Sequence, residues 1–472
     1  MSARLPSEPT RQRLAEAVTA GMPAAIADLA RLVRIPSVSW DGFDQAHVDS
    51  SANAVATLLT ELQLFDRVAI ERGTNPDATP GRPAVLATRA AKPGMPTVLL
   101  YAHHDVQPPG ADEDWDSPPY EPTLRSTPTG DRLHGRGAAD DKAGVMTHIA
   151  ALRALVEAHG EAPGIGIAVF IEGEEEFGSR SFRDFIERHR AALDAEVIIV
   201  ADSDNWDHET PAITASLRGN VTFTLTVRTL EHASHSGMFG GAVPDATLSA
   251  IQLLATLWDA EGAVAVDGLA AFAGATGATP DYPEPQLRAD AGLLDGVRPI
   301  GRGELLDRIW HQPAITVTGM DLPSVRDASN TLTPVVRIKV SARIAPGQSA
   351  EAGYDAIASH LKHHAPHGAV LSFEDVVTGE PFRVDTDAPA YLLAKDAMAA
   401  GWGRDPVEMG IGGSIPFIPT LVDVFPRAQI LVTGVEDPDT RAHSPNESLH
   451  LGVFRRAVLS EALLLTALEG RE

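Results

Sequence analysis

Hydrophobic positions in the first part of the chain recur with the period of an amphipathic helix over residues 10–34. The helix is expected to end before Pro36, because the residue that precedes a proline disfavours helical backbone. Short continuous apolar runs then alternate with helical patterns. These patterns predict strands at 84–89, 97–102, 165–171 and 196–201, and helices at 141–158 and 180–192. Such alternation is typical of an α/β domain whose mixed, largely parallel sheet carries helices on both faces.

The pattern changes near residue 214, where apolar and polar residues begin to alternate strictly. This alternation predicts antiparallel strands with one buried face. The second region is expected to hold strands at 220–230, 335–344 and 369–375 and helices at 244–259 and 350–363, with no element predicted for 260–300. The first pattern returns after about residue 385, with a helix at 389–400, a strand at 428–433 and a helix at 449–468. We therefore predict a discontinuous domain of residues 1–213 and 385–472, with an α+β domain of residues 214–384 inserted into it.

Composition excludes several classes of function. The formal net charge of -26 argues against binding to nucleic acid or to an anionic membrane, since both attract clustered lysine and arginine. The chain has no cysteine, which excludes disulfides, thiolate metal ligands and cysteine nucleophiles. It has neither an 18-residue apolar run nor an N-terminal secretion signal, so we expect a cytoplasmic protein.

Candidate chemistry lies where predicted strands end. The strand at 97–102 runs directly into His103, His104 and Asp105. Residues two apart on an extended strand point to the same side, so Asp105 is placed to orient the ring of His103. A satisfied polar histidine is the alternative for this stretch alone.

Four further clusters share this position, and each also has a structural explanation. They are GRGAADDKAG (135–144), IEGEEEFGS (171–179), VIIVADSDNW (197–206) and RAHSPNES (441–448). Asp140 or Asp141 could cap a helix, the glutamates could form a solvated loop, and Asp202 and Asp204 are common turn residues. Ser444 or Asn446 could cap an element after His443.

Taken together, these clusters predict a metal centre, because ligands bind at the carboxyl ends of strands in open α/β sheets. Imidazole and carboxylate ligands without thiolate suit Zn or Mn. Two ions about 3.5–4 Å apart that share a carboxylate and a water form a hydrolytic centre. A spare glutamate beside a ligand glutamate can take the proton of that water.

The chain resembles the M20 family of di-metal peptidases. Seven stretches carry the resemblance, in the family's order over residues 99–448: AHHDVQP, GRGAADDKAG, EGEEEFGS, VADSDNW, HASHSGMFGG, GGSIPF and AHSPNES. The forms HDVQP, EGEEEFGS, HSGMFGG and GGSIP are most similar to the dipeptidase branch, which includes the carnosine dipeptidases. The resemblance implies a fold of the di-zinc exopeptidase type, with the inserted domain as a lid and dimerisation domain.

The resemblance also implies roles for individual residues. His103 and Asp202 are expected to hold one divalent ion, and Glu176 and His443 the other. Asp140 is expected to bridge both ions and to precede a cis peptide bond. The ions are Zn or Mn, with Co as a further candidate. Asp204 is a second candidate for the role of Asp202.

The remaining roles concern catalysis and substrate. Glu175 is expected to be the general base, and Asp105 to orient His103. His235 is expected to stabilise the oxyanion in the partner subunit of a homodimer formed through the lid domain. Arg343 corresponds to an arginine that binds the substrate carboxylate. The loop of Gly413 and Ser414 is expected to surround the peptide, although Ile411 precedes the glycines where many relatives carry a charged residue.

We therefore predict a metallopeptidase that cleaves dipeptides or short peptides at an amide bond. The alternative is an N-acyl-amino-acid deacylase with the same metal centre. Two other classes of function fit the sequence less well. A binding protein that kept the fold without the chemistry would not need the complete set of ligands and Glu175. An interaction or storage protein explains the acidic charge, but not where the carboxylates lie.

Overall fold

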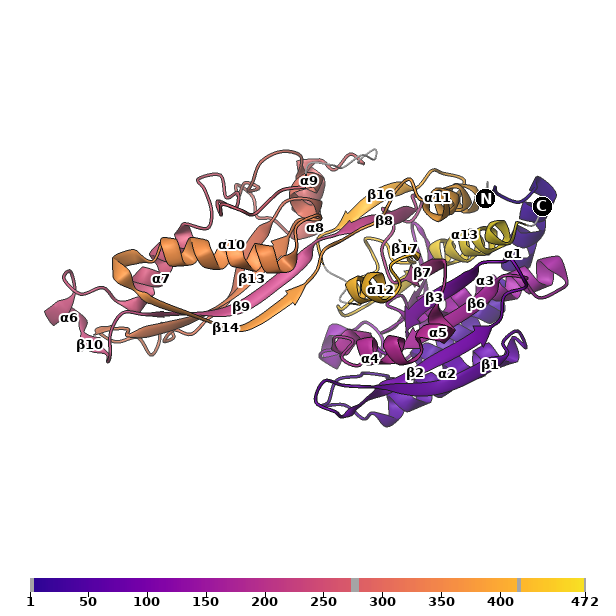
Figure 1. Cartoon of the computed structure of the whole chain (residues 1–472), viewed down its shortest axis with the longest axis horizontal. Coiled ribbons are helices and arrows are strands. Elements are labelled where there is room, and N and C mark those ends of the chain that lie inside the picture. The colour runs from indigo at the N-terminus through magenta and orange to yellow at the C-terminus, as the bar shows by residue number, and fades with distance from the viewer. Residues whose placement is uncertain (1–3, 273–279, 414–416, 471–472) are drawn as a thin grey trace. The chain divides into compact units, whose positions relative to one another are not determined.

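The computed structural model describes residues 4–272, 280–413 and 417–470, and the chain divides into two compact units (Figure 1). Unit 1 comprises Met1–Ala215, Val384–Met409 and Thr420–Glu472. Unit 2 comprises Ser216–Arg383 and Gly410–Pro419.

Unit 1 is built on a mixed sheet. Its strands follow the order β1 (Arg67–Thr74), β2 (Pro80–Arg89), β6 (Gly166–Glu172), β3 (Thr97–His103), β7 (Val197–Ala201), β17 (Gln429–Thr433) and β8 (Ala212–Leu217). The four central strands β6, β3, β7 and β17 are parallel, whereas β1, β2 and β8 pair in the antiparallel sense. The central strands are continuous apolar runs, as expected for a sheet that is covered on both faces.

Helices pack around this sheet. They are α1 (Glu8–Val33), α2 (Ala46–Glu61), α3 (Lys142–His159), α4 (Phe182–Arg188), α5 (Arg190–Leu193), α11 (Pro389–Trp402), α12 (Ile418–Val424) and α13 (Leu451–Glu469). Helix α3 packs against α1, α13 and β3, and α11 packs against α13 and β17. On α4, the ring of Phe185 stacks on Phe170 of β6 at a centroid distance of 4.5 Å. These contacts bury the apolar side of each helix.

Short elements complete unit 1. A three-stranded sheet has the order β18 (Ser448–His450), β5 (Gly130–His134) and β4 (Thr123–Thr127). The 3-10 helices η1 (Asp112–Asp114) and η2 (Glu175–Phe177) lie in loops. Two further short strands pair with β8: β15 (Phe382–Arg383), which belongs to unit 2, and β16 (Val407–Ile411), which crosses the boundary between the units.

Unit 2 contains a four-stranded antiparallel sheet in the order β11 (Ala314–Met320), β13 (Val335–Ile344), β9 (Gly219–Arg228) and β14 (Val370–Gly379). Helices α7 (Ala246–Ala255) and α10 (Ala350–His363) pack against it and cover the alternating apolar residues of β9 and β13. The smaller elements are α6 (Ser236–Phe239), α8 (Glu284–Ala291), α9 (Leu305–Trp310), η3 (Pro366–Gly368), β10 (Ser234–His235) and β12 (Thr331–Leu332).

The predicted fold class is confirmed, although the structure differs from the prediction in several details. The predicted helix at 180–192 is interrupted at His189 and forms α4 and α5. The predicted strand at 84–89 belongs to β2, which is antiparallel to β6 and does not join the parallel set. Helix α2 and strand β1 were not predicted from the sequence, and neither was α8 within 260–300.

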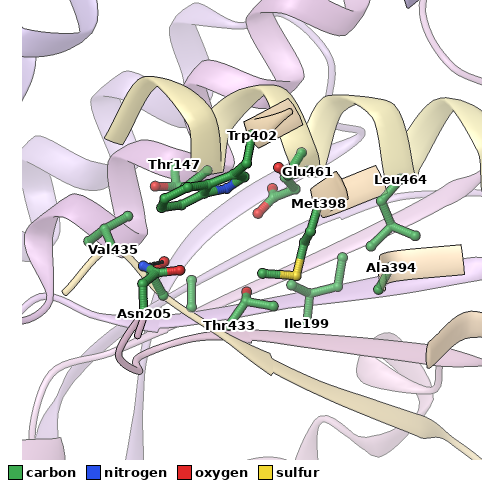
Figure 2. Close-up of a pocket in the computed structure, with 14 residues that line it drawn as sticks. Thr147, Ile199, Asn205, Ala394, Met398, Trp402, Thr433, Val435, Glu461 and Leu464 are labelled. Carbon is green, nitrogen blue, oxygen red and sulfur yellow. Dashed lines mark hydrogen bonds between the residues drawn. The ribbon is translucent and has the colours of Figure 1, made fainter. Parts of the chain in front are cut away.

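A small cavity of about 30 Å³ lies between α11, α13 and the strands β7 and β17 of unit 1 (Figure 2). Met398 and Trp402 of α11 line it together with Leu464 of α13, and Asn205 closes one end. Its size suits a single water molecule. No helix in the described part of the chain has the length and hydropathy of a membrane-spanning segment.

Candidate metal centre

Three parallel strands bring the acidic loops of unit 1 to one edge of the sheet. Strand β3 lies between β6 and β7, and His103 at its end is paired with Glu172 at the end of β6. The loops that follow these strands carry Asp105, Glu175 and Asp202. Since parallel strands end on the same side, the three loops leave the sheet together.

Asp140 lies at the centre of the cluster, because its two carboxylate oxygens face two different histidines. Oδ1 lies 3.1 Å from Nε2 of His103, and Oδ2 lies 3.0 Å from Nε2 of His443. Asp202 lies on the His103 side, with its Oδ1 3.9 Å from Nε2 of His103. Glu176 lies on the His443 side, with Oε2 3.2 Å from Nε2. The other four predicted ligands therefore gather around the carboxylate of Asp140.

The two histidines differ in their surroundings. His103 is buried in the sheet, and its side chain is 1% exposed. His443 lies in a loop, its side chain is 58% exposed, and its backbone has a φ of 59°. A non-glycine residue in this left-handed region is uncommon, and such residues often occur at functional sites. Nearby, Nε2 of Gln107 donates to Oε2 of Glu176 at 2.7 Å, while the buried Oε1 of Glu176 has no hydrogen-bond partner among the described residues.

Asp105 connects His103 to the glutamate loop. Its Oδ1 lies 3.3 Å from Nδ1 of His103 and accepts the amide of Glu175, while Oδ2 accepts the amide of Glu176. The hydroxyl of Ser39 also donates to Oδ2 at 2.7 Å. The fully buried carboxylate thus sets the ring orientation and the backbone of the glutamate loop at the same time.

The side chains of the adjacent residues Asp140 and Asp141 make different contacts. Asp141 caps α3 through the amide of Gly144, and its other oxygen accepts the amide of His103 at 3.0 Å. Asp140 is therefore free to face the histidines. The peptide bond between the two residues is cis, as the family resemblance implied.

Glu447 supports the turn that precedes Asp140. Its buried carboxylate accepts the amides of Gly137, Ala139 and Asp140 and pairs with Arg136 at 2.7 Å. Glu447 belongs to the same loop as His443, so it connects the two segments that carry Asp140 and His443.

The electrostatics of the cluster favour bound cations. Burial opposes protonation of His103, but its hydrogen bonds with Asp105 and Asp140 raise its pKa well above the usual value. Hydrogen bonds with Asp140 and Glu176 raise the pKa of His443 to about 11. Burial raises the pKa of Glu176 to about 7 and that of Asp202 to about 6. Carboxylates this close to one another repel unless cations neutralise them.

The donor set fits divalent metal ions. Three groups of side chains have ligand atoms within 4.8 Å of one another: His103, Glu175 and Asp202; His103, Asp140 and Glu176; and Asp140, Asp202 and Glu436. The unpartnered Oε1 of Glu176 is a buried acceptor, which an ion would satisfy. Imidazole and carboxylate donors suit Zn, Mn and Co.

Glu175 lies beside the cluster and not at its centre. Burial raises its pKa well above the usual value, and the charges of Asp202 and Glu176 act in the same direction, although His103 opposes them. A glutamate with a raised pKa next to candidate ligands has the properties of a general base.

The other predicted site residues belong to unit 2. His235 is exposed at the start of α6, where its Nδ1 accepts the amide of Gly237 at 3.0 Å. Arg343 lies on β13 and is partly buried, which lowers its pKa. Gly413 is partly buried, whereas Ser414 lies outside the described residues.

Gln107, Glu436 and Glu447 join the site in the structure but were not predicted from the sequence. Glu436 follows β17, and a carboxylate after an apolar strand was the signal used for the other clusters. Gln107 and Glu447 lie within the stretches that carry the family resemblance. The hydrogen bonds of Gln107 and Glu447 show that both residues belong to the site, whereas no pattern in the sequence predicted this.

Comparisons with known proteins show what this chain is similar to. The sequence profile described as peptidase family M20/M25/M40 matches residues 99–467. The chain is 31% identical over 423 residues to a cysteinylglycine-S-conjugate dipeptidase of Corynebacterium striatum. The aligned residues cover 89% of this chain and 90% of the relative. It is 26% identical over 391 residues to a β-Ala-His dipeptidase of Rattus norvegicus, which covers 79% of this chain and 77% of the relative. The structure of the dipeptidase Dug1p of Saccharomyces cerevisiae matches with a TM-score of 0.76 at 23% identity, over 98% of both chains.

Proposed function

The chain belongs to peptidase family M20/M25/M40, and from this premise we propose that it hydrolyses the amide bond of dipeptides with two divalent metal ions. One observation carries the proposal. The two oxygens of Asp140 face His103 and His443, with Asp202 on one side and Glu176 on the other. The relatives named as dipeptidases supply the substrate class.

In this proposal His103 and Asp202 would hold one ion, Glu176 and His443 would hold the other, and Asp140 would be a ligand of both. When bound, the ions supply the Lewis acidity that lowers the pKa of water and polarises the amide carbonyl. Zn and Mn are the expected metals, and Co is a further candidate.

Glu175 accepts the proton of the attacking water and then donates it to the nitrogen of the leaving amine. Its buried position beside Asp202 and Glu176 supports this role, because burial raises the pKa of Glu175 well above the usual value and makes the carboxylate a stronger base. Asp105 keeps Nδ1 of His103 in place, so that Nε2 faces Asp140.

Residues of unit 2 recognise the substrate in this proposal. Arg343 binds the substrate carboxylate, since a guanidinium pairs with a carboxylate through two parallel hydrogen bonds. The loop of Gly413 and Ser414 surrounds the peptide. His235 stabilises the oxyanion in the partner subunit, and its exposed position is compatible with contact to another chain.

We propose that the protein is a homodimer and that unit 2, the lid and dimerisation domain, carries the contact. Residues of α6 and α7 expose apolar side chains, of which Met238 is 74% exposed and Ile251 56% exposed. Exposed apolar patches of this kind mark contact surfaces. Ile251→Asp is expected to give a monomer in light scattering, and an unchanged dimer would contradict this contact.

The experiment that tests the function combines metal replacement with a substrate panel. The purified protein is stripped with a chelator, refilled with Zn, Mn or Co singly, and assayed on dipeptides, including Cys-Gly, S-substituted Cys-Gly and β-Ala-His. N-acetylated and N-succinylated amino acids serve as the matched comparison. Metal-dependent cleavage of dipeptides is expected, whereas preferred cleavage of the acylated amino acids would replace the proposal with a deacylase. The cytoplasmic location is likewise a proposal, which cell fractionation tests.

A further inference from the structure

Glu436 is a third carboxylate beside Asp140 and Asp202, and no role has been assigned to it so far. Ligand atoms of the three side chains lie within 4.8 Å of one another. Asp140 faces His103 and His443, whereas Glu436 approaches from the loop after β17. One cation could therefore contact all three carboxylates.

The loop that carries Glu436 is held rigidly against the loop of Asp202. The amide of Asn205 donates to the carbonyl of Glu436 at 2.9 Å, and its Nδ2 donates to the carbonyls of Gly434 and Glu436. Asn205 is buried at the end of the small cavity, next to Val435 (Figure 2). A Cβ on Gly434 would lie 1.7 Å from the carbonyl oxygen of Ser203, so only glycine permits this approach. The two loops thus fix Glu436 and Asp202 relative to each other.

We infer that Glu436 is an additional ligand of the ion held by His103, Asp140 and Asp202. This inference rests on the proposed di-metal function. With Glu436 as a ligand, the two ions have different surroundings, because three carboxylates and one imidazole face the ion beside His103. Asp140, Glu176 and His443 face the second.

The additional carboxylate has a consequence for the choice of metal. Carboxylate and water ligands suit Mn, whereas imidazole suits Zn. The ion beside Glu436 is therefore the one at which Mn competes best with Zn. Removal of the carboxylate should weaken the binding of Mn more than the binding of Zn.

The test measures metal affinity and does not depend on peptidase activity. Wild-type protein, Glu436→Gln and Asp204→Asn are stripped of metal and titrated with Mn and with Zn by equilibrium dialysis, and free Mn is followed by its electron paramagnetic resonance signal. Asp204→Asn is the matched control, because Asp204 faces Glu436 across a backbone bridge but belongs to none of the three ligand groups. It removes a nearby carboxylate charge and leaves the proposed ligand in place.

In Glu436→Gln we expect the affinity for Mn at one of the two sites to fall by about 10- to 100-fold, with a smaller loss for Zn. The loss of affinity for Mn should be smaller in Asp204→Asn. Equal losses in both variants would overturn the inference, since charge alone would then explain them, and unchanged affinity in Glu436→Gln would overturn it as well. If Glu436→Gln does not fold, Glu436→Asp is measured instead, because it keeps the charge on a shorter side chain. A wild-type preference between Mn and Zn in Glu436→Asp would count against ligation by Glu436.

A substrate readout separates ligation from the other chemistry that a carboxylate here could serve. If Glu436→Gln keeps its metal affinity but raises KM for dipeptides with a free amino terminus, and not for N-acetylated dipeptides, Glu436 binds the substrate ammonium and the inference is wrong. If the wild-type protein binds neither Mn nor Zn, the proposed function itself fails. The two failures are therefore distinguishable.

Discussion

The carboxylate of Asp105 lies 3.3 Å from Nδ1 of His103 and accepts the backbone amides of Glu175 and Glu176. One buried side chain thus fixes a candidate ligand on β3 and the loop that follows β6. The candidate base and a candidate ligand of the second ion both belong to that loop.

Asp105→Ala should therefore weaken metal binding without removing any of the proposed ligands. Groups that orient a ligand typically change metal affinity by about 10- to 100-fold when they are replaced. Titration of the stripped protein with Zn or Mn measures the effect, and Ser39→Ala, which removes only one donor to Asp105, should give a smaller one. An Asp105→Ala protein with wild-type affinity for metal would show that His103 needs no such support.

Replacement of the candidate base separates chemistry from metal binding. Glu175→Ala should slow turnover of a dipeptide by roughly 10²–10⁴, because proton transfer by a positioned side chain contributes that much. Metal content measured by mass spectrometry should remain at the wild-type level. Glu121→Gln, on an exposed glutamate, is the control and should leave both quantities unchanged. Near-normal turnover in Glu175→Ala would reject the role of Glu175.

The strand ends of the candidate site could be predicted from the sequence because each is an apolar run that stops at an acidic residue or a histidine. His103 and Asp202 follow this rule on β3 and β7, and the structure brings them within 3.9 Å of each other. The pattern did not decide between Asp140 and Asp141, since both are carboxylates on the same turn. Only the hydrogen bond from Gly144 shows that Asp141 is the cap.

Other features depend on contacts that no local pattern records. Glu436 lies three residues beyond β17 and is followed by Asp437 and Asp439, a composition that is typical of turns. Its position follows from the bonds of Asn205, on a loop far away in the sequence. Helix α2 was missed because serine, asparagine and threonine obscure its apolar face, which becomes evident only when it packs on β2.

Sharing of residues between subunits is testable by mixing two inactive proteins. His235→Ala and Glu175→Ala should each be impaired, but a heterodimer contains one site with an intact Glu175 and an intact His235 from the other chain. Recovery of dipeptidase activity after co-expression or subunit exchange is therefore expected. Mixtures that stay as inactive as the separate variants, although heterodimers form, would argue against a role of His235 in the partner subunit.

Metal binding should release protons and become weaker at lower pH. Hydrogen bonds with Asp140 and Glu176 raise the pKa of His443 to about 11, and hydrogen bonds with Asp105 and Asp140 raise the pKa of His103, which favours the protonated form of both rings before ions bind. Ligand histidines must be neutral, and the protons have to leave. Calorimetric titration of the stripped protein in buffers of different ionisation enthalpy measures the number released. Binding without proton release would contradict the role of these histidines as ligands.

The buried pair of His148 on α3 and Glu461 on α13 predicts how the stability of unit 1 depends on pH. Nδ1 of His148 lies 2.9 Å from the carboxylate of Glu461, and Nε2 lies 3.0 Å from the carbonyl of Tyr101. Burial opposes protonation of His148, but the charge of Glu461 and the hydrogen bond with it raise its pKa above the usual value of about 6.5.

A pKa that is higher in the folded than in the unfolded chain gives stability that is complete below about pH 6.5 and is lost as the pH rises through the folded value. His148→Gln should therefore lower the free energy of unfolding most at pH 6, by about 3–5 kcal/mol for a broken buried pair, and less at higher pH. Denaturant unfolding of both proteins across this range measures the difference. The exposed His363, replaced in the same way, is the control. A constant difference between wild type and His148→Gln from pH 6 upward would show that His148 is neutral in the folded protein and that the pair is an uncharged hydrogen bond.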